Sequence, residues 1–221
     1  MLLALESSDR LCAACLIDTE SVNVAASVTA DLGRGHAEKM MDVIAEVLAR
    51  AGKDYAALTG LAVCVGPGSF TGIRVALATA TGLSVALGIP VAGVTALQAL
   101  AWQALPKAGG KPILSVIDAH RGDVYVQSFS DNALPADQAR QVSIEAAAKI
   151  ASAADLFVCG SGAPLLAGNP PAVSQDALPS VDAVALAALN PAMSVAAKPL
   201  YLRKPDAKPQ ESYTQARAMR G

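Results

Sequence analysis

An α/β fold of two lobes is predicted by three observations: the order of the apolar runs, the polar turns between them, and a restart of that order halfway along the chain. The first set reads as three strands, a helix, a strand, a helix, a strand and a helix, at residues 2–6, 11–17, 22–28, 36–51, 61–65, 71–87, 89–94 and 95–105. Strict alternation of strands and helices would predict a doubly wound sheet. Three strands before the first helix instead predict the β-β-β-α-β-α lobe of the actin-like ATPase, or ribonuclease-H-like, fold.

Local patterns support each element of this first lobe. Residues 2–6 are almost continuously apolar, which is typical of a strand buried on both faces. Short polar turns at 7–10 and 18–21 separate the next two strands. The helix at 36–51 has an apolar stripe opposite its acidic residues and is closed by Gly52.

A second, abbreviated lobe is predicted beyond residue 105. Between 106 and 112 the composition turns to proline, glycine and lysine, as in a linker. Strands at 113–119 and 124–130 then restart the pattern, and a helix, a strand and a helix follow at 143–153, 156–159 and 181–189. We therefore assign residues 1–105 to the first lobe, 106–204 to the second, and expect 205–221 to be a mobile tail.

The composition of the 221 residues limits the classes of partner. Hydrophobic residues make up 53% and charged residues 16%, so the surface is poor in charge and suits a protein partly covered by another subunit. A net charge of −2 gives no general attraction to nucleic acid. The end of the chain, from Tyr201, leans basic, but too weakly for a nucleic-acid site. Glu6 and Asp9 interrupt the first apolar run, so no secretory signal is predicted and we expect a cytoplasmic protein.

One segment is long enough to cross a membrane. No charge occurs between Arg74 and Lys107. However, Gly88-Ile89-Pro90 breaks this segment, and much of it is alanine, threonine, glycine and serine. We therefore expect a buried helix followed by a buried strand, and no membrane partner.

The stretch from Val65 to Arg74 carries the strongest local signal. Three glycines and a proline follow the strand at 61–65, and an uncharged helical run begins at once. Such a turn gathers backbone amides at a helix N-terminus, so it either cradles an anion or forms a rigid corner that presents a loop to a partner. It is not a Walker loop, because Arg74 stands where that loop needs lysine and a hydroxyl.

The candidates for nucleotide binding, all weak, are Glu6, Ser7, Gly68 and Ser69. In actin-like ATPases the first hairpin contacts phosphates and an acid orients magnesium, but this hairpin has no glycine to let the backbone approach a phosphate. Two interpretations of residues 6–8 therefore stay open: a hairpin that contacts phosphate and magnesium, and a hairpin without that role. Ser69 is predicted to cap the helix rather than to act as a nucleophile. No cofactor is expected on this chain alone.

Catalytic and metal-binding residues are not predicted. The two histidines, His36 and His120, have neither a serine elbow nor a second ligand at helical spacing. Cys12 and Cys15 are three positions apart on a strand and so point to opposite faces.

The helix at 71–87 is apolar on all sides, so it should be buried on all sides. Either the second lobe or another chain must then cover it, and its small residues allow a close approach. With the methionines of the helix at 36–51, it could form an interface between subunits; simple core packing is the equal alternative. The predicted interface residues are Met40, Met41, Ile44, Val47, Phe70, Ile73, Arg74, Leu77, Ala80, Thr81 and Ser84.

Several of these segments resemble the TsaB (also called YeaZ) family. They are residues 3–8 (LALESS), 34–38 (RGHAE), 66–74 (GPGSFTGIR), 83–97 (LSVALGIPVAGVTAL) and 199–203 (PLYLR). The resemblance is strong over residues 1–105 and thin beyond, and the string at 66–74 is highly specific.

This resemblance implies an actin-like fold and a part in making threonylcarbamoyladenosine beside the anticodon of tRNA. It implies a noncatalytic subunit that forms a homodimer alone and pairs through the same helical face with a TsaD-like transferase, with a TsaE-like ATPase as a further partner. ATP and a divalent metal are then expected in the partner subunits, and tRNA contacts only through the complex.

The chain departs from the family pattern at three positions. Glu6 replaces the usual aspartate, Ala37 a serine, and Thr81 a frequent lysine, which weakens a nucleotide role and removes a charge from the expected interface. The alternative function is an active actin-fold ATPase or phosphotransferase that uses Glu6, Ser7 and the glycine turn. A metalloprotease is a third, weaker alternative.

Overall fold

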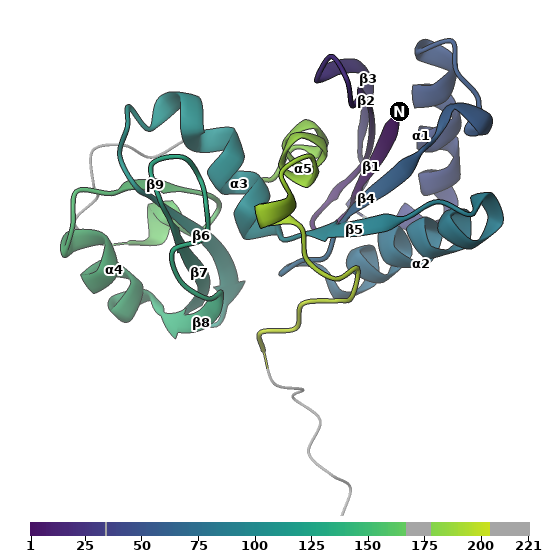
Figure 1. Ribbon diagram of the computed structural model, residues 1–221. Coiled ribbons are helices and arrows are strands. Elements are labelled where there is room, and N and C mark those ends of the chain that lie inside the picture. The colour runs from purple at the N-terminus through teal and green to yellow at the C-terminus, as the bar shows by residue number, and fades with distance from the viewer. Residues whose placement is uncertain (34, 167–177, 204–221) are drawn as a thin grey trace, which may run out of the picture.

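The computed structural model describes residues 1–33, 35–166 and 178–203 and contains two lobes (Figure 1). The first lobe is a five-stranded sheet in the order β3-β2-β1-β4-β5. The pairs β1–β2 and β2–β3 are antiparallel, whereas β1–β4 and β4–β5 are parallel. Its elements are β1 (Leu2–Glu6), β2 (Leu11–Asp18), β3 (Asn23–Asp31), α1 (His36–Arg50), β4 (Gly60–Cys64), α2 (Phe70–Leu87) and β5 (Val91–Val94). This order confirms the actin-like α/β fold predicted from the sequence.

The second lobe repeats the first without its last strand. Its four-stranded sheet has the order β8-β7-β6-β9, with β6–β7 and β7–β8 antiparallel and β6–β9 parallel. The elements from residue 96 on are α3 (Ala96–Ala104), β6 (Ile113–His120), β7 (Asp123–Phe129), β8 (Arg140–Ser143), α4 (Ile144–Ser152), β9 (Phe157–Cys159) and α5 (Val181–Ala188). Short 3-10 turns lie at Tyr55–Ala57, Leu105–Lys107, Ala163–Leu165 and Pro191–Met193.

Side-chain caps fix where several helices begin. The Ser69 hydroxyl accepts from the backbone N–H of Gly72 at 3.3 Å, which confirms the predicted cap of α2. Thr95 and Gln98 form a reciprocal capping box at the start of α3. At its other end α2 stops at Gly88, whose left-handed φ of 67° lets the chain turn into β5.

The helices and sheets form alternating layers (Figure 1). Helices α1 and α2 cover the outer face of the first sheet, α3 and α5 lie between the two sheets, and α4 covers the outer face of the second. We call the layer between the sheets the interlobe core. It includes Ala4, Ile17, Cys64, Leu97, Leu100, Ile113, Phe129, Phe157 and Val184.

The predicted boundary between the lobes needs a correction. Residues 106–204 were assigned to the second lobe, but α5 packs on β1, β2, β4 and β5 of the first sheet. It returns there because its buried alanines and valines cover the face that α1 and α2 leave open. The predicted tail at 205–221 lies outside the described residues.

Candidate functional site

The glycine turn, residues 66–72, packs against the hairpin between β1 and β2. The backbone N–H of Ser69 donates to the carbonyl oxygen of Ser8 at 2.6 Å, and the Ser7 hydroxyl donates to the carbonyl oxygen of Gly72 at 2.7 Å. A Cβ atom on Gly68 would overlap the Ser8 carbonyl, and one on Gly72 would overlap the Ser7 carbonyl. These two glycines therefore admit the protein's own backbone, where a phosphate loop would leave room for an anion. The residues present do not fit a phosphate group at this place.

Glu6 lies behind this turn and is 1% exposed. Its Oε1 accepts from both the backbone N–H and the hydroxyl of Ser8, each at 2.6 Å. Its Oε2 is buried without a hydrogen-bond partner. Burial raises the pKa of this carboxyl, and the neighbouring Cys64 thiol and Ser8 only partly oppose that rise. Burial thus disfavours the ionised form of Glu6, and its two hydrogen bonds with Ser8 hold the Ser7-Ser8 turn in place.

His36 fastens the same hairpin to α1. The buried imidazole donates through Nε2 to the carbonyl oxygen of Asp9 at 3.0 Å. The His36 side chain is therefore packed inside the first lobe and is not presented at the surface. The first hairpin is thus held by α1 through His36 and by α2 through Ser69.

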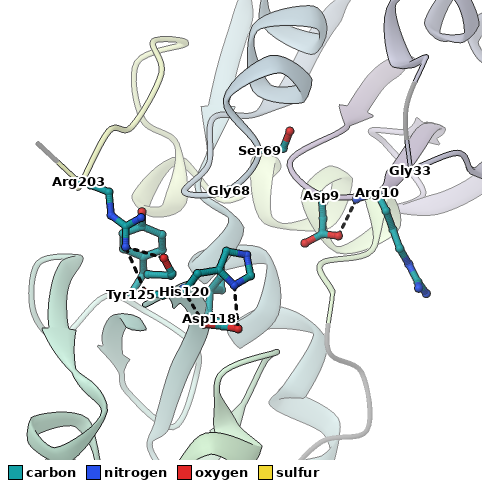
Figure 2. A pocket seen from close by; sticks show the side chains of 11 residues that line it. Asp9, Arg10, Gly33, Gly68, Ser69, Asp118, His120, Tyr125 and Arg203 are labelled. Atoms are coloured by element: carbon teal, nitrogen blue, oxygen red, sulfur yellow. Dashed lines mark hydrogen bonds and ion pairs between the residues drawn. The ribbon is translucent and has the colours of Figure 1, made fainter. Parts of the chain in front are cut away.

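A cleft of about 410 Å³ opens between the lobes beside the glycine turn (Figure 2). Its first-lobe wall carries Asp9, Arg10, Gly33, Gly68 and Ser69, and its second-lobe wall carries Ile117, Asp118, Ala119, His120 and Tyr125. Arg203 reaches the cleft from the end of the described chain. Gly68 and Ser69, two of the weak nucleotide candidates, line this cleft, whereas Glu6 and Ser7 are buried behind it.

Arg10 and Asp118 of the cleft each contact a second ionisable side chain. Arg10 contacts Asp31 at 3.4 Å, and Asp118 contacts the His120 ring at 3.2 Å. Within the described residues no three His, Cys, Asp or Glu side chains gather in a way that could hold a metal ion. The cleft can therefore accept a small polar molecule, but it shows no cluster dedicated to one ion or phosphate.

The cysteines are buried thiols. Cys12 belongs to the core under α1 and Cys15 to the interlobe core, which confirms that the two point to opposite faces of β2. Burial raises the pKa of Cys12 to about 11 and that of Cys159 to about 12. Neutral, enclosed thiols of this kind are poor nucleophiles.

Helix α2 is buried on one face only, which corrects the prediction of burial on all sides. The second lobe lies on the opposite side of the first sheet and does not cover it (Figure 1). Its exposed face carries Phe70, Arg74, Ala78, Thr81 and Val85, spaced three or four residues apart. We call these five residues the α2 face. Val85 is 80% exposed, the largest value among the exposed large hydrophobic residues described.

The predicted interface set divides accordingly. The structure places Met40, Ile44, Val47, Ile73, Leu77 and Ala80 inside the core of the first lobe, so their side chains are not available to a partner. Their apolar character packs α1 and α2 onto the sheet. Met41, Phe70, Arg74 and Thr81 are exposed, and Ser84 is half-buried.

An aromatic and cationic cluster marks the start of the α2 face. The Phe70 ring stacks on the Tyr201 ring with centroids 5.5 Å apart, and the Arg74 guanidinium lies 3.7 Å from the Phe70 centroid. Arg74 also donates through Nε to the Tyr201 hydroxyl at 2.8 Å. We call Phe70, Arg74 and Tyr201 the aromatic cluster. Tyr201 was not among the predicted interface residues, although it lies in the PLYLR motif at 199–203.

By length and composition, α2 is the one helix in the described part of the chain that could cross a membrane, with 28% of it buried. It starts at the Ser69 cap and runs beside β4 and β5, so one face of it packs against the sheet. The uncharged segment noted in the sequence therefore contains α2 from Val75 on, β5 and α3.

The two repeated lobes around a cleft define an α/β protein of the actin-like class, and comparison with known proteins specifies its family. The family model for TsaD, described as tRNA N6-adenosine threonylcarbamoyltransferase, matches residues 25–177. The solved structure of YeaZ from Pseudomonas aeruginosa superposes with a TM-score of 0.79 at 30% identity, covering 91% of this chain and 99% of that one.

Relatives by sequence agree. The tRNA threonylcarbamoyladenosine biosynthesis protein TsaB of Escherichia coli is 31% identical over 124 residues, 56% of this chain and 52% of that protein. A Mycobacterium tuberculosis protein named only as uncharacterized is 37% identical over 192 residues, 82% of this chain and 81% of its own length. The chain therefore belongs to the TsaD family and, within it, to the TsaB (YeaZ) group.

Proposed function

We propose that this chain is a noncatalytic scaffold in tRNA threonylcarbamoyladenosine biosynthesis. It acts by pairing with a TsaD-like transferase through the α2 face, and a TsaE-like ATPase joins the same assembly. ATP and a divalent metal belong to those partners, and tRNA is reached through the complex. The names of the TsaB relatives support a role in this pathway. The geometry of the glycine turn and of Glu6 supports the noncatalytic role.

The observation that carries this proposal is the closed glycine turn. In a working phosphate site, small residues leave space for the anion and present amides to it. Here the carbonyl groups of Ser8 and Ser7 occupy the space beside Gly68 and Gly72, and a carbonyl oxygen repels a phosphate. The nearby acid, Glu6, has a raised pKa and no access to solvent, so it is poorly suited to orient magnesium.

The exposed α2 face supports pairing with another chain. From Val75 to Leu87 the helix has no charged residue, yet one face of it lies at the surface. A contiguous apolar surface of this kind usually marks a protein–protein contact. Phe70, Arg74 and Tyr201 at its end are residue types that often dominate the energy of such contacts.

The experiment is a binding assay with the TsaD-like protein of the same cell. We expect light scattering to show a one-to-one complex that replaces a homodimer of this chain. Val85→Asp should weaken that complex at least 100-fold while leaving the melting temperature unchanged, because a charge is placed on an exposed apolar contact. Leu165→Asp, at an exposed apolar position of the second lobe, is the matched control and should bind as the wild type does.

The alternative of an active ATPase or phosphotransferase has its own outcome in the same experiment. Isothermal titration of the isolated chain with ATP and magnesium should show no binding in the micromolar range if the glycine turn is closed as described. Micromolar binding lost in Ser69→Ala, together with no complex under any condition, would favour that alternative.

A further inference from the structure

The last described segment, residues 194–203, runs from the first lobe to the second, and we call it the strap (Figure 1). It first pairs with the edge of the first sheet, where Gly93 and Val195 exchange two backbone hydrogen bonds of 2.8 Å. The N–H of Leu200 then donates to the carbonyl oxygen of Val65 at 2.8 Å. A Cβ atom on Gly93 would overlap the Ala196 carbonyl, so the strap lies tightly against β5.

The aromatic cluster anchors the strap on the first lobe. Tyr201 stacks on Phe70 and accepts the hydrogen bond from Arg74, so one strap residue contacts two successive turns of α2. The cluster is nevertheless open to solvent, with Phe70 56% and Tyr201 48% exposed. Anything that binds at the start of the α2 face therefore meets the strap as well.

Two residues further on, Arg203 reaches the second lobe. Its Nη2 donates to the carbonyl oxygen of Ala119 at 2.6 Å and lies 3.3 Å from that of His120 (Figure 2). Both carbonyls belong to the last two residues of β6, at the corner where the chain turns into β7. There His120 and Arg121 have positive φ angles of 60° and 57°, a conformation that costs energy for residues with a side chain.

We propose that the strap is a latch between the lobes, through which contacts at the aromatic cluster control the β6–β7 corner and the opening of the cleft. Only Leu202 separates Tyr201 from Arg203, and two residues of extended chain span about 7 Å. Because this tether is short, a displacement of the Tyr201 backbone pulls on Arg203 and weakens its hold on the two carbonyls. Release of Arg203 removes a charged donor from a strained corner, whose residues Asp118, Ala119 and His120 line the cleft.

The test is hydrogen–deuterium exchange of the full chain, followed in the peptide covering residues 118–124. Arg203→Ala removes the second-lobe end of the latch, and Tyr201→Ala removes the first-lobe end. We expect exchange in this peptide to accelerate at least fivefold in both variants, with strands β1 and β4 unchanged. Lys198→Ala, which removes a positive charge from an exposed position of the same strap, should exchange at the wild-type rate.

The decisive comparison is Tyr201→Ala, because this residue contacts α2 and the measured peptide belongs to the second lobe. Acceleration confined to residues 70–75 and 195–203 would overturn the latch, and so would an unchanged corner in Arg203→Ala. If Tyr201→Ala fails to fold, Tyr201→Phe keeps the ring and removes only the oxygen that accepts from Arg74. It should still accelerate exchange at 118–124, and an unchanged rate would again overturn the proposal. These outcomes do not depend on which partner the chain binds.

Discussion

At the scale of single residues, the carboxyl of Glu6 links the chemistry of the first hairpin to pH. Its pKa in the unfolded chain is near 4.5, and burial raises it in the folded protein. Between these two values the folded state binds more protons than the unfolded state, so the free energy of unfolding falls as pH rises through this window. Below pH 4.5 the contribution of this group to stability is fully present.

Glu6→Gln should remove that pH dependence. An amide oxygen can accept the two bonds from Ser8 without carrying a charge, so we expect the variant to match the wild type at pH 4.5. At pH 8 it should be more stable than the wild type, because the wild type then buries a carboxyl group that the unfolded chain ionises freely. Urea unfolding at both pH values measures this, with the exposed Glu20→Gln as control. A variant that gains no stability relative to the wild type between pH 4.5 and pH 8 would show that folding does not raise the pKa of Glu6.

Two glycines of α2 give a matched pair of residue substitutions. Replacing glycine by alanine inside a helix normally stabilises it by about 0.5–1 kcal/mol. Gly82→Ala should follow this rule, because nothing lies within 4 Å of its new methyl group. Gly72→Ala should instead destabilise the protein by about 1–3 kcal/mol, since the methyl overlaps the Ser7 carbonyl. Thermal unfolding of both variants checks the closed glycine turn, and equal effects would contradict it.

At the scale of elements, α2 carries both core positions and surface positions along a helix that has no charged residue after Arg74. Leu77→Asp places a charge in the core of the first lobe, and the cost of burying it should unfold most of the protein. Val85→Asp, two turns further on, should leave the circular dichroism spectrum and melting temperature as in the wild type. If Leu77→Asp folded normally and lost only association, Leu77 would have to face a partner.

The same helix shows why part of this structure could be predicted from the sequence and part could not. The order of strands and helices follows from periodicity and turn residues, and β1 was predicted with its observed bounds. In α2 nearly every position is apolar or small, so the sequence does not distinguish one face of the helix from the other and cannot indicate which face is buried. The strand β8 was missed because Arg140–Ser143 is short and mostly polar. Contacts such as Arg74–Tyr201 join residues far apart in the sequence, and no local pattern indicates them.

At the scale of the whole molecule, the interlobe core makes the two lobes depend on each other. Helix α3 follows the first sheet and packs on the second, while α5 follows the second sheet and packs on the first. These two helices cover the inner faces of both sheets, so neither sheet can bury its inner face without the other half of the sequence. Helix α5 packs on strands that lie far from it in the sequence, and for this reason local patterns assigned it to the wrong lobe.

We therefore expect the lobes to unfold together. Trp102, the single tryptophan, lies on α3 and packs against the interlobe core, so its fluorescence reports on both sheets. Its urea transition should coincide with that of the far-ultraviolet circular dichroism, as in a two-state process. Phe129→Ala opens a cavity on the second-lobe side of this core. It should lower the free energy of unfolding reported by both probes by the same amount, about 3–5 kcal/mol.

The matched control is Phe70→Ala, which removes the same ring from the surface. Its cost should be far smaller, since Phe70 is 56% exposed and contributes little to either core. Two separate transitions in Phe129→Ala, with the first lobe keeping its wild-type stability, would show that the lobes fold independently. In that case the strap would be the main connection that holds the cleft, and Arg203→Ala should then alter the angle between the lobes without changing the midpoint of either transition.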